Sequence, residues 1–454
     1  MFLAQGIGGI GISIQKQSAE TRLAGDLNKV PTNLHHVHLM GICGTAMASM
    51  AGMLKEKGFL VTGSDQNVYP PMSHFLESLS IPMIEGYSAE NLIPKPDLVI
   101  VGNVITNDNP EAIELSRQKL PYISFPQALK HFAFKGKRTI VISGTHGKTT
   151  TSALVAWILE RAGMNPGFMI GGIPLNFQTN FKLAEGRYFV IEGDEYDTAF
   201  FDKRPKFLHY DPWATILTNI EFDHSDIFRD LDHVVGFFRK LIDMSPIDGI
   251  LVANGDDPVI AGAISRARCR TVTYSLSENG LWRAIETTTQ QELTRFKVIK
   301  EGEEYMTLFT PMYGHHNLYN VLSAVVLADL LEIPSNIISQ SVMSFLGVRR
   351  RQENIGEKRG ILILDDFAHH PTAVRETIGA VREKYKGRRL ITVFEPRSNS
   401  TRRNVFQARY ASSFDDSDLV MIPEPPLMEK IPPHERFSSQ RLVEDLEARA
   451  LKSL

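Results

Sequence analysis

A glycine-rich loop between an apolar strand and a helix constrains the fold of this chain more than any other feature. The sequence GTHGKTT at 144–150 follows the apolar run 139–142 and opens a predicted helix over 149–161. In such a loop, backbone N–H groups and the helix N-terminus surround phosphate oxygens, while Lys148 adds positive charge and Thr149 offers a hydroxyl to Mg²⁺. The residues predicted to bind nucleotide here are Gly144, Thr145, His146, Gly147, Lys148, Thr149 and Thr150.

The bulk properties describe an ordinary globular protein of two or three domains. Its 454 residues exceed what one hydrophobic core usually supports. A net charge of −3 excludes the basic field of a nucleic-acid binder. The two cysteines, Cys43 and Cys269, are too few for a disulfide framework and suit a reducing cytoplasm. No apolar run reaches the roughly 18 residues that span a bilayer, so no membrane insertion is expected.

Short apolar strands alternate with helices along most of the chain, which predicts α/β domains with largely parallel sheets. Residues 1–33 contain a GxGxxG pattern with no room for a preceding strand, and we expect a disordered extension there. The predicted domains are 34–136, 137–347 and 348–454. Within the second, the Thr-rich and charged stretch 270–312 is expected to form antiparallel strands.

Acidic residues follow the predicted strand 188–191 immediately. Glu192, Asp194, Glu195 and Asp197 are four carboxylates within six residues. The carboxyl ends of parallel strands face the crevice where ligands bind, and closely spaced carboxylates repel one another unless a cation neutralises some of them. The pattern therefore predicts a cation site beside the phosphate loop, although a solvated acidic turn is the alternative.

Histidines follow two more predicted strands. His224 stands beside Asp223 after strand 214–217, and a neutral imidazole in that position can bind a metal. A second group, Asp365, Asp366, His369 and His370, follows strand 360–364.

Two further groups precede that last strand. Asn317 and Asn320 belong to the run GHHNLYN at 314–320, where Asn317 either contacts nucleotide or merely caps the next helix. Arg349–Arg351 offers an arginine, taken as Arg350, to stabilise charge on a transferred phosphate, although a solvated charge run is the simpler alternative.

These motifs, in this order, resemble the Mur ligase family of bacterial cell-wall synthesis, from about residue 34 onward. The resemblance implies a UDP-binding Rossmann-like domain, a central P-loop ATPase domain and a C-terminal Rossmann-like domain. It also implies an ATP- and Mg²⁺-dependent ligase that phosphorylates a carboxylate and then lets an amine displace the phosphate. Members of the family continue beyond the last helix seen here, so the resemblance predicts a trimmed or incomplete closing domain.

The resemblance also assigns roles to particular residues. Lys148, Glu192, His224, Arg350 and His369 are implied to be catalytic, with Thr149, Glu192 and His224 as metal ligands. Asn317, Asn320, Arg350 and Asp366 are implied to contact nucleotide together with the glycine-rich loop. The substrate contacts implied are Gly41, Gly44, Ser64, Asp65, Asp194, Glu195, His370, Arg397, Ser398 and Asn399.

Within the family, the sequences GICG at 41–44 and GSD at 63–65 favour the branch that uses UDP-N-acetylmuramic acid. The sequences EGDEYDTAFF at 192–201 and EPRSN at 395–399 are more similar to members that attach the tripeptide L-alanyl-γ-D-glutamyl-meso-diaminopimelate during recycling than to members that add L-alanine. A cytoplasmic protein, monomeric or weakly dimeric and without a nucleic-acid partner, is the corresponding expectation.

Two interpretations of a different class stay open on the sequence alone. A protein that binds UDP-sugars without catalysis is one, and the presence of Lys148, Glu192 and His224 argues against it. A nicotinamide-dependent dehydrogenase is the other, because Asp65 lies near the fingerprint spacing after Gly41. That interpretation lacks the middle glycine and leaves the phosphate loop unexplained.

Overall fold

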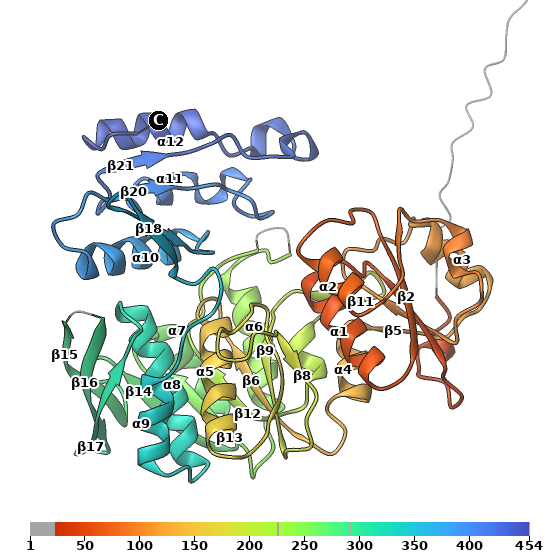
Figure 1. The fold of residues 1–454 in the computed structure, drawn as a ribbon, viewed down its shortest axis with the longest axis horizontal. Helices are drawn as coiled ribbons and strands as arrows, with labels where there is room; N and C mark the ends of the chain where they lie inside the picture. The colour runs from red at the N-terminus through yellow and green to blue at the C-terminus, as the bar shows by residue number, and fades with distance from the viewer. Residues whose placement is uncertain (1–22, 225–226, 291, 454) are drawn as a thin grey trace, which may run out of the picture.

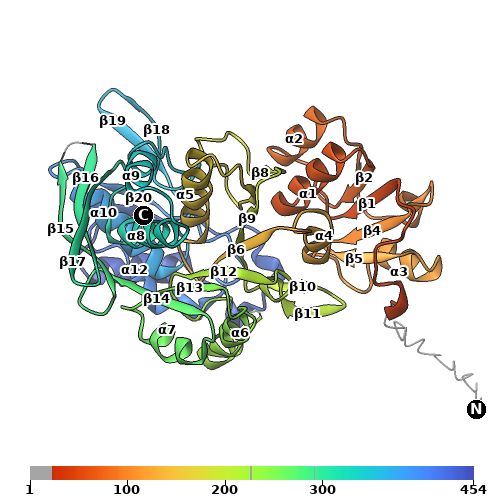
Figure 2. The ribbon, with the colours of Figure 1, turned by 90° about the horizontal axis from the view of Figure 1, so that it is seen from below.

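The computed structural model describes residues 23–224, 227–290 and 292–453, which form a three-domain α/β architecture (Figure 1). The N-terminal domain lies beside the central one and the C-terminal domain lies above it in that view. Figure 2 shows the same side-by-side placement of the first two domains from below. Among the described residues, no helix is both long and apolar enough to cross a membrane.

The N-terminal domain is a parallel sheet with the strand order β3-β2-β1-β4-β5. Its strands and helices are β1 (His36–Met40), α1 (Thr45–Glu56), β2 (Leu60–Asp65), α2 (Met72–Ser78), β3 (Met83–Glu85), β4 (Leu98–Val101), α3 (Pro110–Arg117), β5 (Tyr122–Ser124) and α4 (Phe125–Phe132). The short, continuously apolar strands fit a sheet covered on both faces, as β4 shows by being buried throughout.

The segment before β1 is packed rather than free. Asn28 donates to the Tyr122 carbonyl at 3.1 Å and exchanges hydrogen bonds with Gln127 of α4. This differs from the disorder predicted for residues 1–33, of which residues 1–22 lie outside the described part. An amide side chain that finds a strand-end carbonyl is a tertiary contact, which local composition does not indicate.

The central domain is built on a sheet of order β17-β16-β15-β14-β13-β12-β6-β9-β7-β8. Its strands are β6 (Arg138–Ser143), β7 (Gly167–Met169), β8 (Phe181–Lys182), β9 (Tyr188–Gly193), β12 (Pro212–Leu217), β13 (Ile250–Asn254), β14 (Arg270–Ser275), β15 (Trp282–Gln290), β16 (Leu293–Lys300) and β17 (Glu303–Thr310), and the hairpin β10 (Asp197–Ala199) with β11 (Asp202–Pro205) stands apart from it. Its helices are α5 (Lys148–Arg161), α6 (Leu231–Asp243), α7 (Pro258–Ala263), α8 (His315–Leu330) and α9 (Ser335–Met343).

The prediction of antiparallel strands over 270–312 is wrong for the first of them. β14 pairs with β13 in parallel, and β15 starts in parallel with β14 before β16 and β17 continue antiparallel. Val272 and Tyr274 are buried in the same core as α5 and α8, so this strand extends the nucleotide-binding sheet. Its Thr content suits either pairing, which is why composition alone misassigned it.

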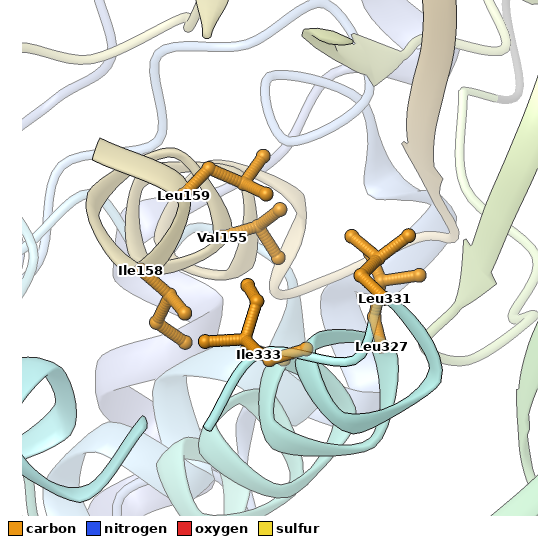
Figure 3. Close-up of a pocket in the computed structure, with 8 residues that line it drawn as sticks. Val155, Ile158, Leu159, Leu327, Leu331 and Ile333 are labelled. Atoms are coloured by element: carbon orange, nitrogen blue, oxygen red, sulfur yellow. The ribbon is translucent and has the colours of Figure 1, made fainter. Parts of the chain in front are cut away.

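Helices α5 and α8 pack against each other across one face of the central sheet. Figure 3 shows the narrow hollow between them, lined entirely by aliphatic side chains such as Val155, Leu327 and Ile333. The hollow offers no polar group to a ligand, and we assign it to the core. Its lining belongs to the contact between α5 and α8, and α5 follows the phosphate loop directly.

The C-terminal domain contains β18 (Glu353–Lys358), β19 (Ile361–Asp365), α10 (Pro371–Lys384), β20 (Ile391–Val393), α11 (Gln407–Tyr410), β21 (Leu419–Met421) and α12 (Ser439–Ala448). β18 pairs with β19 antiparallel, whereas β20 pairs with β21 in parallel. The apolar run at 360–364 forms a strand as predicted, and its side chains Ile361 and Ile363 are exposed. The end of β19 nevertheless brings Asp366 to the central domain.

Candidate active site

The phosphate loop joins the end of β6 to the start of α5, as predicted. Its glycines adopt backbone conformations that disfavour a side chain, with φ of +137° at Gly144 and +83° at Gly147. Asn219, at the end of β12, holds the loop: its backbone carbonyl accepts from Thr145 N at 2.9 Å and its side-chain oxygen accepts from His146 N at 2.8 Å. Those two N–H groups therefore serve the loop itself, and the first N–H groups of α5 remain for a phosphate. No role was predicted for Asn219 from the sequence.

Lys148 is buried in a charged cluster with two residues from other strand ends. Its Nζ donates to the Gly144 carbonyl at 2.6 Å and lies 3.0 Å from Glu195 Oε2, while His224 Nε2 lies 3.3 Å from Glu195 Oε1. Burial alone would raise the pKa of Glu195, but Lys148 and His224 outweigh it and hold that pKa at about 2. Burial would lower the pKa of Lys148, but Glu195 and Asp194 raise it. The cluster therefore keeps a charged lysine at the loop.

Glu192 ends β9 directly opposite Thr149. The Thr149 hydroxyl donates to Glu192 Oε2 at 2.9 Å, and the Gly171 N–H donates to Oε1 at 2.5 Å. Burial, together with Asp194, raises the pKa of Glu192, so this carboxylate lacks full compensation for its charge. A hydroxyl and a carboxylate are the hard oxygen donors that Mg²⁺ prefers, and the pair fits such an ion.

We expect Glu192→Gln and His224→Ala each to raise the Mg²⁺ concentration needed for half-maximal activity, by roughly tenfold or more. Each change removes one predicted ligand, and the two ligands are predicted to bind different Mg²⁺ ions. Activity measured against Mg²⁺ concentration checks this, with the exposed Glu77→Gln as a control that removes a carboxylate from the N-terminal domain. Unchanged Mg²⁺ dependence in both variants would contradict the predicted metal site.

The arginine that reaches the phosphate loop is Arg351, whereas the sequence pattern had favoured Arg350. An Arg351 guanidinium nitrogen lies 3.4 Å from Thr149 Oγ1. Arg350 instead pairs with Asp365, with Nε 3.3 Å from Oδ2 and a side chain that is 54% exposed. Its φ of +58° turns the chain locally, and Arg350 and Arg351 contact different groups. The sequence pattern carries no signal of that turn.

Asn317 and Asn320 lie in one hydrogen-bonded row beside the loop. Asn320 Nδ2 donates to Asn317 Oδ1 at 3.2 Å, and Asn317 Nδ2 donates to Gln352 Oε1 at 2.9 Å. The alternative that Asn317 only caps α8 is wrong, because the helix begins at His315 with Gly314 as its N-cap. Asp366 closes the row by accepting from Gln352 N at 2.8 Å. The row therefore spans the central and C-terminal domains.

His369 and His370 immediately precede α10, with His370 as its N-cap, and the structure places their side chains differently. His370 is buried at the helix N-terminus, with its ring centroid 4.7 Å from that of His146. His369 Nδ1 lies 3.0 Å from the Phe367 carbonyl, nearer the surface. Burial lowers the pKa of both imidazoles, which keeps them neutral near pH 7. His370 is thus brought to the phosphate loop although it was predicted as a substrate contact.

The predicted UDP-binding turn lies at the start of α1. Asp65 Oδ2 accepts from Cys43 N at 2.9 Å, and the Ser64 carbonyl accepts from Gly41 N at 2.8 Å, so β2 holds the turn that ends at Gly44. The Ser64 hydroxyl is buried and donates to Glu111 at 2.7 Å, which makes it a support beneath the turn. A pocket connects this turn with the acidic strand end, and it is lined by Thr45, Ala46, Phe125, Met169, Ile170, Gly171, Ile191, Glu192, Asp194 and Tyr210.

The predicted peptide contacts lie in the loop after β20. Arg397 is exposed and its Nε lies 3.3 Å from Glu395 Oε1. Ser398 forms a local turn with Thr401, and Asn399 Oδ1 accepts from Arg402 at 2.7 Å. The guanidinium of Arg397 is therefore exposed beside Glu395, whereas Ser398 and Asn399 form contacts within the loop.

Three protein-family models match successive parts of the chain. They are described as "Mur ligase family, catalytic domain" at residues 36–136, "Mur ligase middle domain" at 142–328, and "Mur ligase, glutamate ligase domain" at 350–451. The UDP-N-acetylmuramate–L-alanyl-γ-D-glutamyl-meso-2,6-diaminoheptandioate ligase of Escherichia coli K12 is 41% identical over 390 residues, covering 86% of this chain and 85% of that protein. The UDP-N-acetylmuramate–L-alanine ligase of Syntrophotalea carbinolica is 33% identical over 386 residues, covering 85% and 82%.

Solved structures agree with these matches. The murein peptide ligase from Psychrobacter arcticus superposes with a TM-score of 0.71 at 34% identity, covering 92% of this chain and 90% of that one. The UDP-N-acetylmuramate–alanine ligase from Thermotoga maritima has a TM-score of 0.75 at 23% identity, covering 92% and 89%, and supports the fold alone.

Proposed function

The chain belongs to the Mur ligase family of ATP-dependent ligases, and from that premise we propose that it joins UDP-N-acetylmuramic acid to L-alanyl-γ-D-glutamyl-meso-diaminopimelate. The pocket shared by α1 and the end of β9 is the observation that supports the binding of the carboxylate substrate in this proposal. Thr45 at the predicted UDP-binding turn and Glu192 beside the phosphate loop line the same space. A substrate that spans this pocket presents a carboxylate to the residues suited to activate it.

In this proposal, each group of residues has a separate role. The turn at 41–44 and Asp65 hold the UDP end, and Lys148 with the start of α5 holds the ATP phosphates. Thr149 and Glu192 would hold one Mg²⁺ and His224 would hold a second, and such ions would supply positive charge to the phosphate and the carboxylate. The carboxylate oxygen attacks the γ-phosphorus, ADP leaves, and the resulting acyl phosphate is attacked by the amine with loss of phosphate. Positioning by these side chains and closure of the domains over the site exclude water from the acyl phosphate.

The domain boundaries we propose are 34–136, 137–347 and 348–454, with nucleotide contacts from Asn317, Asn320 and Asp366 reaching across the last one. We propose a cytoplasmic protein, monomeric or weakly dimeric, that recycles cell-wall peptide. The identity of 41% to a tripeptide ligase, against 33% to an L-alanine ligase, favours the peptide as the amine substrate.

We expect kcat/KM for the tripeptide to exceed that for L-alanine by at least about a hundredfold, because remote carboxylates supply binding energy that orients the amine. Exposed Arg397 is suited to bind one of them in bidentate fashion. Arg397→Ala should therefore lower kcat/KM for the tripeptide by roughly tenfold or more and leave that for L-alanine nearly unchanged.

Steady-state kinetics with both amines test the proposal, and Arg375→Ala serves as a matched control because Arg375 is also exposed and pairs with a neighbouring glutamate. Efficient use of L-alanine would favour the alanine-adding ligase instead. Full tripeptide activity in Arg397→Ala would remove this arginine from the peptide site.

A further inference from the structure

The pocket at the end of β9 presents negative charge to a proposed substrate that is itself an anion. Two of the residues that line it, Glu192 and Asp194, are carboxylates, and none of the described lining residues is a lysine, an arginine or a histidine. The proposed substrate brings a further carboxylate to the same space. Like charges repel strongly where water is partly excluded. Binding of that substrate therefore requires positive charge near both of the lining carboxylates.

The two lining carboxylates differ in how their charge is compensated. The Thr149 hydroxyl donates to Glu192 at 2.9 Å, and that pair fits a Mg²⁺ ion. Asp194 is not part of this pair. Lys148 is engaged elsewhere, because its Nζ lies 3.0 Å from Glu195 Oε2. Asp194 therefore needs a cation of its own.

Lys206 is the cation that accompanies Asp194. Its Nζ lies 3.6 Å from Asp194 Oδ2, and Asp194 has no other ion-pair partner among the described residues. This distance is too long for a hydrogen bond, so the contact is electrostatic. Lys206 does not line the pocket itself, whereas Tyr210 of the same segment does. The side chain of Lys206 is only 11% exposed, which limits the screening of the pair by salt.

The backbone fixes the position of Lys206 beside the acidic strand end. The residue begins the 3₁₀ helix η3 (Lys206–His209) directly after β11, and its N–H donates to the Tyr196 carbonyl at 3.0 Å. The next N–H, that of Phe207, donates to the Asp194 carbonyl at 3.4 Å, and the Phe207 side chain is fully buried. The ammonium group also lies over the Tyr196 ring, 5.4 Å from its centroid. These contacts hold the lysine close to Asp194.

We propose that Lys206 is a positioning residue for the carboxylate substrate: it compensates the charge of Asp194, and the pocket then accepts an anion beside Glu192. This inference rests on the proposed function, since it concerns how UDP-N-acetylmuramic acid is bound. Lys206 acts through Asp194 and does not contact the substrate. Without the lysine, Asp194 repels the carboxylate of the substrate. The resulting loss of affinity depends on the charge of the ligand and not on its shape.

The experiment compares two ligands that differ in charge and hardly in shape: UDP-N-acetylmuramic acid and its carboxamide, in which an NH₂ group replaces one oxygen of the lactyl carboxylate. Dissociation constants are measured by calorimetry in the presence of Mg²⁺ and a non-hydrolysable ATP analogue. Lys206→Met should weaken binding of the acid by roughly tenfold or more, as expected for an uncompensated charge in a partly buried site. Binding of the carboxamide should stay nearly unchanged, which also shows that the variant is folded.

Two further variants test how the lysine acts. Lys206→Met/Asp194→Asn removes both charges of the pair, and the preference for the acid over the carboxamide should return nearly to that of the parent. Lys203→Met is the matched control, because Lys203 is an exposed lysine of β11 that pairs with Asp197 at 2.8 Å. Its loss should change neither dissociation constant, since exposed pairs are screened by water and salt.

The other outcomes would overturn the inference, each in a distinct way. Equal weakening of both ligands in Lys206→Met would show that the lysine only supports the fold of the pocket. A preference that stays low in the double variant would show that the ammonium group contacts the substrate directly. An unchanged preference in Lys206→Met would remove this lysine from substrate binding. A parent protein that does not bind UDP-N-acetylmuramic acid would contradict the proposed function as well, whereas the three preceding results leave that function intact.

Discussion

Lys148→Ala should lower kcat by at least about a thousandfold, because it deletes a preorganised positive charge from the place where negative charge develops on the transferred phosphate. The lysine is held ready by its bonds to the Gly144 carbonyl and to Glu195. Among the described residues, Arg351 also reaches the loop, but it contacts Thr149 and does not take the place of the lysine. Phosphate release from ATP, with both substrates present, measures the effect.

The same change should also cost stability, because it removes the lysine that compensates the charge of the buried Glu195 carboxylate. Removing one member of a buried pair typically costs about 3–5 kcal/mol. Lys148→Ala/Glu195→Gln should regain much of that stability, since the uncompensated charge is gone, but none of the turnover. Thermal unfolding and activity of the two variants therefore separate folding from chemistry. Near-normal phosphate release by folded Lys148→Ala would contradict the assignment of the phosphate loop.

The strand, loop and helix around Lys148 were predictable because each depends on neighbours in sequence. An apolar run, two glycines that adopt positive φ and a helix former such as Ala153 lie within about one βα unit. The acidic end of β9 was predictable for a related reason, since parallel strands deliver their carboxyl ends to one edge. Local pattern and sheet geometry thus sufficed to predict that the acidic strand end lies beside the phosphate loop, where Thr149 donates to Glu192.

The contacts of Asn219, Glu221 and Arg351 were not predicted because they involve residues that are far away in the sequence. Asn219 holds a loop that lies 73 residues earlier in the chain, and Glu221 bonds to Thr372, 151 residues later. The choice between Arg350 and Arg351 depends on a single backbone angle. Adjacent side chains of one residue type look alike in a sequence, and only the turn that separates them decides which reaches the site.

The role assigned to Ser64 changes once the burial of its hydroxyl is known. Its place beside Asp65 suggested contact with the substrate, yet its hydroxyl points inward to Glu111, which also accepts from Asn91 at 2.5 Å. A buried carboxylate needs such donors, and they in turn fix the turn above them. The sequence indicated that Ser64 lies at the predicted UDP-binding turn, and the structure shows that its hydroxyl supports this turn from beneath.

Gly144→Ala should abolish nucleotide binding and destabilise the central domain, because the added methyl group has no space. Built on this backbone, the Cβ would lie 2.8 Å from the Asn219 carbonyl oxygen and nearer still to Thr218 Oγ1. Neither group moves freely: the Asn219 carbonyl accepts from Thr145 N, and the Thr218 hydroxyl donates to the His146 carbonyl at 2.6 Å. The loop must therefore shift away from the end of β12, and the N–H groups at the start of α5 shift with it.

Gly356→Ala isolates the steric part of this effect. Gly356 has φ of +146°, close to the +137° of Gly144, but nothing lies within 4 Å of the position that its added methyl group would take. Backbone strain costs about 1–3 kcal/mol at either site, and overpacking adds about 1–3 kcal/mol at Gly144 only. Thermal unfolding should show the larger loss for Gly144→Ala, and calorimetry should show nucleotide binding lost there and retained in Gly356→Ala. Equal effects in the two variants would mean that the tight contact between the loop and β12 does not shape the nucleotide site.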